Sequence, residues 1–276
     1  MDSIGNTVMT DGELDQFIDH VRLETGINLD TSKRYLLESR LGPILQQFSM
    51  NYSELLRSVV IGGSIENQAL ISAITTNETY FFRDEHPFNL LKYKLIPDFL
   101  RNNQNAVVRI ASAACSSGQE AYSIAMVLKE TLFDLTERSV QVQAFDISDD
   151  IVTAASKGQY SKFEVERGLS EEKIHRYFDC VEDRYQVKAE LCSIVSFSKQ
   201  NILKPAGMMG KYNIIFCRNV VNYFGLKDRA LLFDNLADML LPEGVLVIGA
   251  TEFINDQTGN FVKKSDKGSV YYEKID

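Results

Sequence analysis

The 276-residue sequence has no tryptophan, five prolines, three histidines and four cysteines. It has no apolar run near the ~20 residues that a membrane-spanning helix needs. The acidic, polar segment from Met1 to Asp15 resembles neither a signal nor a transit peptide. No two cysteines have the spacing of metal ligands, so we expect a reduced, cytoplasmic protein without a metal site; they are Cys115, Cys180, Cys192 and Cys217.

Basic residues are also scarce, with 29 Lys and Arg against 38 Asp and Glu, which gives a net charge of −9. Nucleic-acid binding depends on a cationic surface, so this balance argues against a broad nucleic-acid partner. The hydrophobic content of 45% is ordinary for a globular chain. The length suits one large or two modest domains.

The chain divides into a helical first part and a second part of alternating elements. Leu14, Phe17, Ile18 and Val21 follow helical spacing, and we expect further helices up to residue 72, with a break at Gly42-Pro43. Residues 73–84 form a polar, β-branched linker. Residues 85–276 form the second domain.

In the second part, short apolar strands alternate with helices. This pattern predicts an α/β fold, Rossmann-like, with a mostly parallel sheet covered on both faces. The expected strands are Val107–Ala113, Val140–Phe145, Ile194–Phe197, Ile214–Cys217 and Val245–Ile248, with a late hairpin at Phe261–Lys264 and Val270–Lys274. The expected helices are His86–Arg101, Glu120–Leu132, Asp149–Lys157, Glu171–Phe178 and Lys227–Leu240. Residues 179–198 break the alternation and predict a small antiparallel β insertion.

Ligands of such a sheet bind beyond the carboxyl ends of the strands, and three of these ends carry suggestive residues. Small residues from Ala113 to Gly118 precede a helix that begins near Glu120. They allow a close approach to the backbone, or they form an ordinary tight turn. The glycine fingerprint G-x-G-x-x-G of a dinucleotide site is missing, which favours a ligand without phosphates.

The other two strand ends carry Asp146 and the run from Cys217 to Phe224. An acidic residue in the place of Asp146 commonly binds ribose hydroxyls, although it also suits a helix cap. Arg218 and Asn219 follow a buried strand as ligand-binding or loop-capping residues. Cys217 is better explained as a buried apolar residue than as a nucleophile, because no histidine lies near it in sequence.

Several of these segments resemble motifs of the chemotaxis receptor methyltransferase (CheR) family. The segment from Thr75 to Arg83 resembles the family's linker signature, and the segment from Ser112 to Ala125 resembles its first cofactor motif. Phe145–Ser148 matches its ribose-binding turn, Phe216–Val220 its fourth-strand motif and Leu241–Gly244 its last crossover. The matches follow the family's order from about residue 70 to residue 250.

The chain also departs from the family pattern. The family usually has tryptophan in place of Ala111 and Glu-Pro near Gln119 and Ala121. Its His-Ser-Glu after the last strand is here Ala250-Thr251-Glu252.

The resemblance implies an S-adenosylmethionine-dependent protein-glutamate O-methyltransferase that acts on the cytoplasmic domains of methyl-accepting chemotaxis receptors, as a monomer that does not insert into the membrane. It implies a cofactor site formed by Asn77, Thr79, Arg83, Glu120, Asp146, Asn201, Ile202, Arg218 and Asn219, with Arg83 and Tyr223 as catalytic residues. Asp146 would hold the ribose, Glu120 the amine, and Asn201 and Ile202 the adenine.

The resemblance also bears on receptor binding. The resemblance implies a basic helical face on the N-terminal domain that meets the receptor. The first 72 residues of this chain carry five basic and ten acidic residues, so we expect only a local patch of Lys33, Arg34 and Arg40. Many relatives bind a receptor pentapeptide on their β insertion, next to a glycine-containing loop. The matching stretch from Phe178 to Tyr185 is short and lacks glycine, so we expect no pentapeptide binding.

Two other functions compatible with the sequence are a nicotinamide-dependent oxidoreductase and a noncatalytic cofactor-binding adaptor. The missing glycine fingerprint counts against the first. The presence of all the expected cofactor contacts counts against the second.

Overall fold

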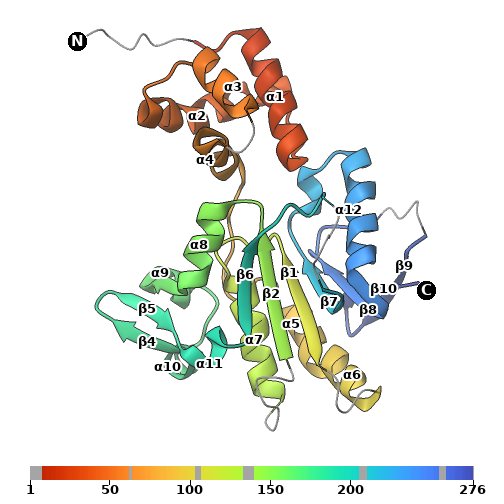
Figure 1. Ribbon diagram of the computed structural model, residues 1–276. Helices are drawn as coiled ribbons and strands as arrows, with labels where there is room; N and C mark the ends of the chain where they lie inside the picture. The colour runs from red at the N-terminus through yellow and green to blue at the C-terminus, as the bar shows by residue number, and fades with distance from the viewer. Residues whose placement is uncertain are drawn as a thin grey trace.

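The computed structural model describes residues 8–61, 64–102, 107–132, 140–204, 210–254 and 259–275. The first seven residues of the acidic N-terminal segment therefore lie outside the described residues. A small helical domain sits above the carboxyl ends of the strands of a larger α/β domain (Figure 1). Within the described residues, no helix is long and apolar enough to cross a membrane.

The N-terminal domain consists of α1 (Asp11–Thr25), the short η1 (Thr31–Lys33), α2 (Arg34–Phe48), α3 (Tyr52–Val60) and α4 (Ile65–Ile74). Two of these helices begin with reciprocal caps: Thr10 with Glu13 in α1, and Asn51 with Glu54 in α3. The helices enclose an apolar cluster of their own, whose completely buried members include Phe17, Val21, Leu37, Leu41, Leu55 and Leu70.

The expected break at Gly42-Pro43 is wrong, because α2 continues through Pro43 to Phe48. A proline inside a helix removes the hydrogen bond to the carbonyl four residues earlier, here that of Ser39. Both Ser39 and Pro43 are exposed to solvent, so water can bond this carbonyl. The packed apolar face, with Leu37, Leu41 and Ile44 buried, continues on the opposite side.

The second domain contains a seven-stranded sheet in the order β6-β2-β1-β7-β8-β10-β9. Its strands are β1 (Val108–Ala113), β2 (Val140–Asp146), β6 (Val195–Lys199), β7 (Tyr212–Cys217), β8 (Leu240–Ile248), β9 (Phe261–Asp266) and β10 (Ser269–Lys274). The strands from β6 to β8 pair in parallel, and the β9–β10 hairpin adds to β8 with β10 antiparallel. The expected Rossmann-like α/β fold, with its late hairpin, is confirmed.

Helices pack on both faces of this sheet (Figure 1). They are α5 (Glu85–Leu90), the π-helix η2 (Leu91–Leu95), α6 (Ile96–Asn102), α7 (Gln119–Thr131), α8 (Asp149–Lys157) and α12 (Leu226–Met239). Successive strand residues face opposite sides. In β1, Ile110 belongs to the core beneath α7, and its neighbour Ala111 belongs to the second core, which contains Leu236 of α12.

The small sheet differs from the expected insertion at both ends. Its strands are β3 (Gln159–Ser161), β5 (Arg184–Val187) and β4 (Phe178–Val181), in that order, with α9 (Lys162–Glu166) and α10 (Glu171–Tyr177) between β3 and β4. The sheet therefore begins about twenty residues before Asp179. After α11 (Ala189–Cys192), residues 195–199 pair with β2 in the main sheet, which confirms the expected strand Ile194–Phe197, so the small sheet ends at Val187. The three-residue β3 is too short to give an alternating pattern in the sequence.

The two domains contact each other at two places. At the end of α1, the Nδ2 of Asn201 donates to the Glu24 carbonyl at 2.7 Å, and the Asn28 N–H donates to the Tyr223 carbonyl at 2.8 Å. At the end of α4, the Ser72 hydroxyl lies 2.8 Å from that of Ser148, at the start of α8. These contacts enclose the space above the strand ends.

Candidate functional site

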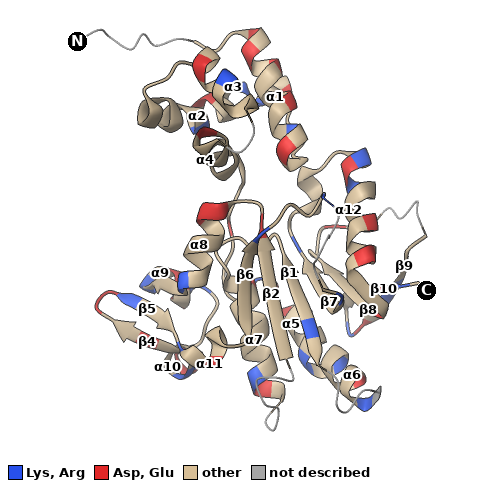
Figure 2. Ribbon diagram, viewed as in Figure 1, with Lys and Arg blue, Asp and Glu red and all other residues tan. Residues whose placement is uncertain are grey.

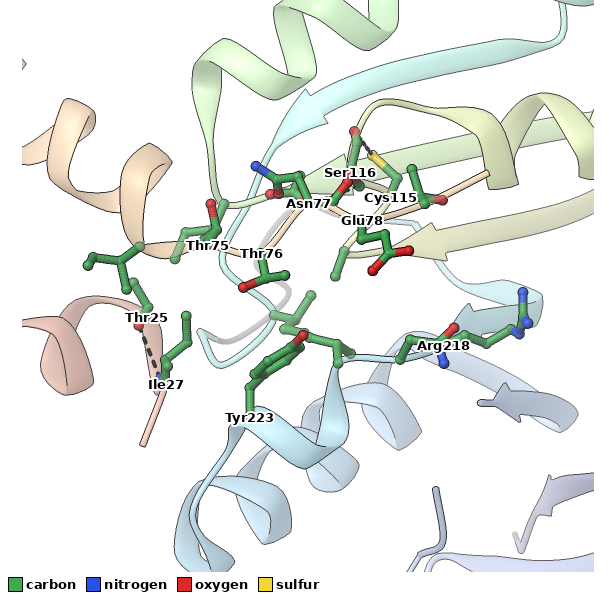
Figure 3. A pocket seen from close by; sticks show the side chains of 18 of the residues that line it. Thr25, Ile27, Thr75, Thr76, Asn77, Glu78, Cys115, Ser116, Arg218 and Tyr223 are labelled. Atoms are coloured by element: carbon green, nitrogen blue, oxygen red, sulfur yellow. Dashed lines mark hydrogen bonds between the residues drawn. The ribbon is translucent and has the colours of Figure 1, made fainter. Parts of the chain in front are cut away.

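A pocket lies at this junction, between the strand ends, the linker and the N-terminal helices. All ten residues that the sequence predicted for the site line it: Asn77, Thr79, Arg83, Glu120, Asp146, Asn201, Ile202, Arg218, Asn219 and Tyr223. Figure 3 shows Tyr223 projecting toward the linker residue Thr76, with Ser116 and Cys115 on another wall. The structure thus brings together residues that are up to 146 positions apart in sequence, from Asn77 to Tyr223.

The loop after β1 has an unusual backbone. Ala114 and Ser116 have φ values of 56° and 50°, and Gly118, at the start of α7, has a φ of 91°. A Cβ on Gly118 would lie 3.1 Å from both Ala155 and Phe197, so glycine is favoured by conformation and by space. Strained, small-residue loops of this kind are typical of sites where a ligand approaches the backbone.

Asp146 ends β2 and is almost completely buried. Its Oδ2 accepts the Ser116 N–H at 2.9 Å, and its Oδ1 accepts the Ser148 N–H at 3.1 Å. It does not cap α8, because the Ser148 side chain performs that role by accepting from the Ile151 N–H. Burial raises the pKa of the Asp146 carboxyl, against the opposing effect of these backbone hydrogen bonds. Its remaining lone pairs can accept ligand hydroxyls.

Glu120 lies in the first turn of α7 and also lines the pocket. Its Oε1 accepts the Ser112 hydroxyl at 2.7 Å, and its Oε2 accepts the Arg218 Nη1 at 2.9 Å. The carboxylate is therefore held in one orientation by two neighbours. It still has lone pairs for an ammonium group of a ligand.

Arg218 connects Glu120 with the linker. Its side chain is only 1% exposed, and its Nη2 donates to the Arg83 carbonyl at 2.6 Å and to Asp84 at 2.8 Å. The Nε of Arg218 is buried without a hydrogen-bond partner among the described residues. Most of its donors are thus used inside the protein, so Arg218 orients Glu120 and the linker in addition to lining the pocket.

The linker itself is fixed by further polar contacts. The Arg83 Nη1 donates to the Glu78 carbonyl at 2.7 Å, and the Ser116 hydroxyl donates to the Asn77 carbonyl at 2.9 Å. The Arg167 guanidinium holds the pKa of the exposed Glu78 carboxyl below its ordinary value. Thr79 lines the pocket between these anchors.

On the side of β6, Asn201 and Ile202 form another wall. The Asn201 side chain bonds the Glu24 carbonyl and also accepts the Leu203 N–H at 2.8 Å. Ile202 contributes a mostly buried apolar surface, and its carbonyl accepts the Asn235 Nδ2 at 3.1 Å. An apolar wall beside amide groups suits a flat purine ring.

The loop after β7 carries Asn219 and Tyr223. Asn219 takes a left-handed conformation with a φ of 59°. Tyr223 lies in η4 (Val221–Tyr223), lines the pocket and is 41% exposed. Its ring is therefore accessible to a bound substrate.

Two further parts of the site were not predicted from the sequence. The N-terminal domain supplies part of the wall through Thr25, Ile27, Leu29 and Leu36, which lie far from the cofactor motifs in sequence. Glu252, which we noted only as part of a departing motif, is buried beneath the loop that carries Asn219. In the sequence, the sign of a role for Glu252 is that a carboxylate follows the strand β8.

The cysteines and histidines near the site do not supply a nucleophile. Burial raises the pKa of the Cys115 and Cys217 thiols well above the ordinary value, which keeps both neutral. His20 bonds Asn67 inside the N-terminal domain at 2.8 Å. In the part of the chain that the structure describes, no cluster of His, Cys, Asp and Glu could hold a metal ion.

The predicted basic patch is wrong for two of its three residues. Arg34 pairs with Asp11 and Glu38, and it donates to the Met9 carbonyl. The Arg40 Nη1 donates to the Ala73, Ile74 and Thr75 carbonyls, which end α4. In Figure 2 acidic and basic positions are mixed over α1 to α4. These arginines stabilise the domain, and Lys33 alone is left of the patch.

The residues that line the pocket indicate which kind of cofactor it can bind. Asp146 offers buried acceptors for two hydroxyls, Glu120 offers a charge for an amine, and Ile202 offers an apolar face. Arg218 already bonds protein oxygens, and the loop after β1 lacks the glycines of a pyrophosphate site. These features fit a nucleoside with an amino-acid tail, and the class they define is an S-adenosylmethionine-dependent methyltransferase.

Comparison with known proteins identifies the family. Residues 77–269 match the description "CheR methyltransferase, SAM binding domain", and residues 12–75 match "CheR methyltransferase, all-alpha domain". The chain is 38% identical to a chemotaxis protein methyltransferase of Vibrio parahaemolyticus, over 95% of this chain and 97% of that one. It is 36% identical to chemotaxis protein methyltransferase Cher2 of Pseudomonas putida, over 96% of this chain and all of that one. The chain belongs to the CheR methyltransferase family, and its cofactor is S-adenosylmethionine.

Proposed function

We propose that this enzyme transfers a methyl group from S-adenosylmethionine to glutamate side chains of methyl-accepting chemotaxis receptors. The observation that carries the proposal is the joining of all ten predicted site residues in one pocket of a CheR-family chain. The relatives named as chemotaxis protein methyltransferases match almost the whole chain, including the N-terminal domain. Since such acceptors are receptor cytoplasmic domains, we propose a cytoplasmic enzyme that works as a monomer.

Each side chain of the pocket has a binding role in this proposal. The bound cofactor supplies an electrophilic methyl group on a sulfonium centre. Asp146 accepts the ribose hydroxyls, Glu120 attracts the methionyl ammonium group, and Ile202 and Asn201 flank the adenine. Arg83 fixes the methionyl end together with the backbone of the loop after β1, and Tyr223 lies on the acceptor side.

The acceptor needs no general base. A glutamate carboxylate has a reference pKa of about 4.3 and is ionised at neutral pH. Among the described residues that line the pocket, none is a histidine, and Cys115 is kept neutral by burial. Alignment of the two reactants can supply up to roughly 7–11 kcal/mol of the barrier in well-oriented systems. The rigid anchors of Asp146, Glu120 and Arg218 suit a catalyst of this kind.

Mass spectrometry of a receptor cytoplasmic fragment tests this function. We expect incubation with enzyme and S-adenosylmethionine to add methyl groups to glutamates of the fragment. A fragment whose modified glutamates are replaced by glutamine serves as the control and should gain none. An enzyme that binds the cofactor but modifies no receptor fragment would be a noncatalytic adaptor or would act on another acceptor.

A further inference from the structure

Glu252 is a buried carboxylate that touches the backbone of two separate strand ends. It follows β8 and is only 8% exposed. Its Oε2 accepts the Asn219 N–H at 2.8 Å and the Gly249 N–H at 2.7 Å, and its Oε1 accepts the Val221 N–H at 2.7 Å. One side chain therefore connects the loop after β7 to the turn after β8.

Glu252 has no cationic partner in the described part of the chain, since its polar contacts are these backbone N–H groups. Burying a carboxylate is costly unless its oxygens are satisfied. Here three N–H donors satisfy it. These donors belong to residues that would otherwise have unpaired N–H groups at the ends of β7 and β8.

The segment that Glu252 holds leads directly to the pocket. Asn219 and Tyr223 line the pocket, whereas Glu252 does not. Asn219 takes the left-handed conformation, with a φ of 59°, which asparagine adopts more readily than most other non-glycine residues. Glu252 accepts hydrogen bonds from the N–H groups of Asn219 and Val221, so it holds the loop backbone on both sides of Val220.

The geometry of Gly249 supports the same conclusion. A Cβ at this position would lie 2.6 Å from the Glu252 Oε2 and 2.9 Å from the Asn219 Nδ2. No side chain fits between the carboxylate and the loop without displacing one of them. Gly249 is thus a second position from which the contact can be disturbed without removing the charge.

We propose that Glu252 is a positioning residue for methyl transfer: it holds the loop of residues 219–223 in the conformation that binds the cofactor and presents Tyr223. The proposal rests on the proposed function, because it assumes that this pocket binds S-adenosylmethionine. Glu252 acts through the loop and does not touch the reactants.

The variant Glu252→Gln tests the proposal because it preserves size and replaces one oxygen by an NH₂ group. That group would face an N–H donor at either carboxylate position, so the loop should loosen. Glu243→Gln is the matched control, since it makes the same change of charge at an exposed position of β8. Gly249→Ala is the second variant. It disturbs the same contact and can be measured even if Glu252→Gln does not fold.

The measurements are calorimetric affinity for S-adenosylhomocysteine, kcat and KM for a receptor fragment, and fluorine NMR of enzyme labelled with fluorotyrosine. The Tyr223 resonance is assigned from Tyr223→Phe. We expect Glu252→Gln and Gly249→Ala to weaken binding by about tenfold or more and to shift or broaden the Tyr223 resonance. Glu243→Gln should match the wild type in both.

A purely structural role would lower the melting temperature of Glu252→Gln and leave the affinity and the Tyr223 resonance of the folded protein unchanged. Unchanged affinity together with an unchanged Tyr223 resonance, in either folded variant, would overturn the proposal. The affinity measurement uses no acceptor, so a wrong acceptor assignment would leave wild-type affinity intact and contradict only the proposed function.

Discussion

Asp146 shows how a single residue links stability to cofactor binding. Burial raises the pKa of its carboxyl from the usual 3.8, so folding favours the protonated form. The stability that this form contributes is present at low pH and is lost as the pH rises through the raised pKa. At neutral pH the cofactor-free protein therefore carries a buried carboxylate at some cost, and ligand hydroxyls can offset it.

We predict that affinity for S-adenosylhomocysteine falls as the pH drops through the raised pKa of Asp146. Protonation removes an acceptor that the ribose hydroxyls need. Calorimetry between about pH 7 and about pH 4 should show the decrease beginning at a higher pH than an unperturbed aspartate would give.

Asp146→Ala should bind S-adenosylhomocysteine too weakly to detect, because each unmet buried hydrogen-bonding group costs about 1–3 kcal/mol. Near-wild-type affinity in a folded Asp146→Ala protein would contradict the assignment.

Arg83 and Tyr223 should affect turnover more than folding. The Tyr223 ring is partly exposed, and its interdomain hydrogen bond uses the backbone carbonyl, which Tyr223→Phe preserves. We expect Arg83→Ala and Tyr223→Phe each to lower kcat/KM by about tenfold or more, or roughly 1.4 kcal/mol of transition-state stabilisation. Thermal unfolding should change little. Full methyl transfer by both variants would show that the reaction centre lies elsewhere.

At the scale of elements, the strands and the α/β helices were predictable because each buries a continuous apolar pattern. Val108–Ala113 and the β9–β10 hairpin lie close to the expected ranges. The helix break expected at Gly42-Pro43 was wrong, because Pro43 lies on the exposed side of α2 and water can bond the carbonyl that it leaves free. The strand β3 was missed because three residues give no periodicity, and because it pairs with residues of β5 that lie 23 to 27 positions away in sequence.

The end of α1 is an element whose geometry the site depends on. Gly26 ends this helix with a φ of 75°, and a Cβ there would collide with the Leu203 side chain and press on Phe224. We predict that Gly26→Ala lowers the free energy of unfolding by roughly 1–3 kcal/mol and weakens S-adenosylhomocysteine binding. Chemical denaturation and calorimetry measure the two effects.

Gly12→Ala is the control within the same helix. A Cβ at Gly12 meets nothing within 4 Å, and its φ is not positive. Its free energy of unfolding should stay the same or rise by up to about 0.5 kcal/mol, with unchanged affinity. Equal effects of the two substitutions would show that the packing of α1 against the loop after β6 does not matter for the cofactor.

The small sheet offers β4 as an edge strand, yet we still predict that it binds no receptor pentapeptide. Glu182 takes a φ of 54° in the turn from β4 to β5, so the turn forms without glycine and stays short. Glu182 and Asp183 are exposed at its tip and would repel an acidic peptide. A labelled tail peptide should show no binding at micromolar concentrations. Micromolar binding that maps to residues 185–191 would contradict this prediction.

At the scale of the whole molecule, the cofactor pocket is shared by two domains. The strand-end residues could be predicted because parallel strands bring their carboxyl ends to one edge of the sheet. Thr25, Ile27 and Leu36 could not, because their place in the wall depends on how the helical domain packs on the sheet. The same packing uses Arg34 and Arg40 internally, which is why the expected docking patch is not available.

The central claim is that the transferred methyl group forms an ester on a receptor glutamate. The most direct test uses tritiated S-adenosylmethionine, a receptor cytoplasmic fragment and mild alkaline treatment of the labelled product. We expect that the wild-type enzyme labels the fragment, that Asp146→Ala does not, and that alkali releases the label as volatile methanol. Label that stays on the fragment in alkali would show methylation of nitrogen or another base-stable position, and would contradict the proposed function.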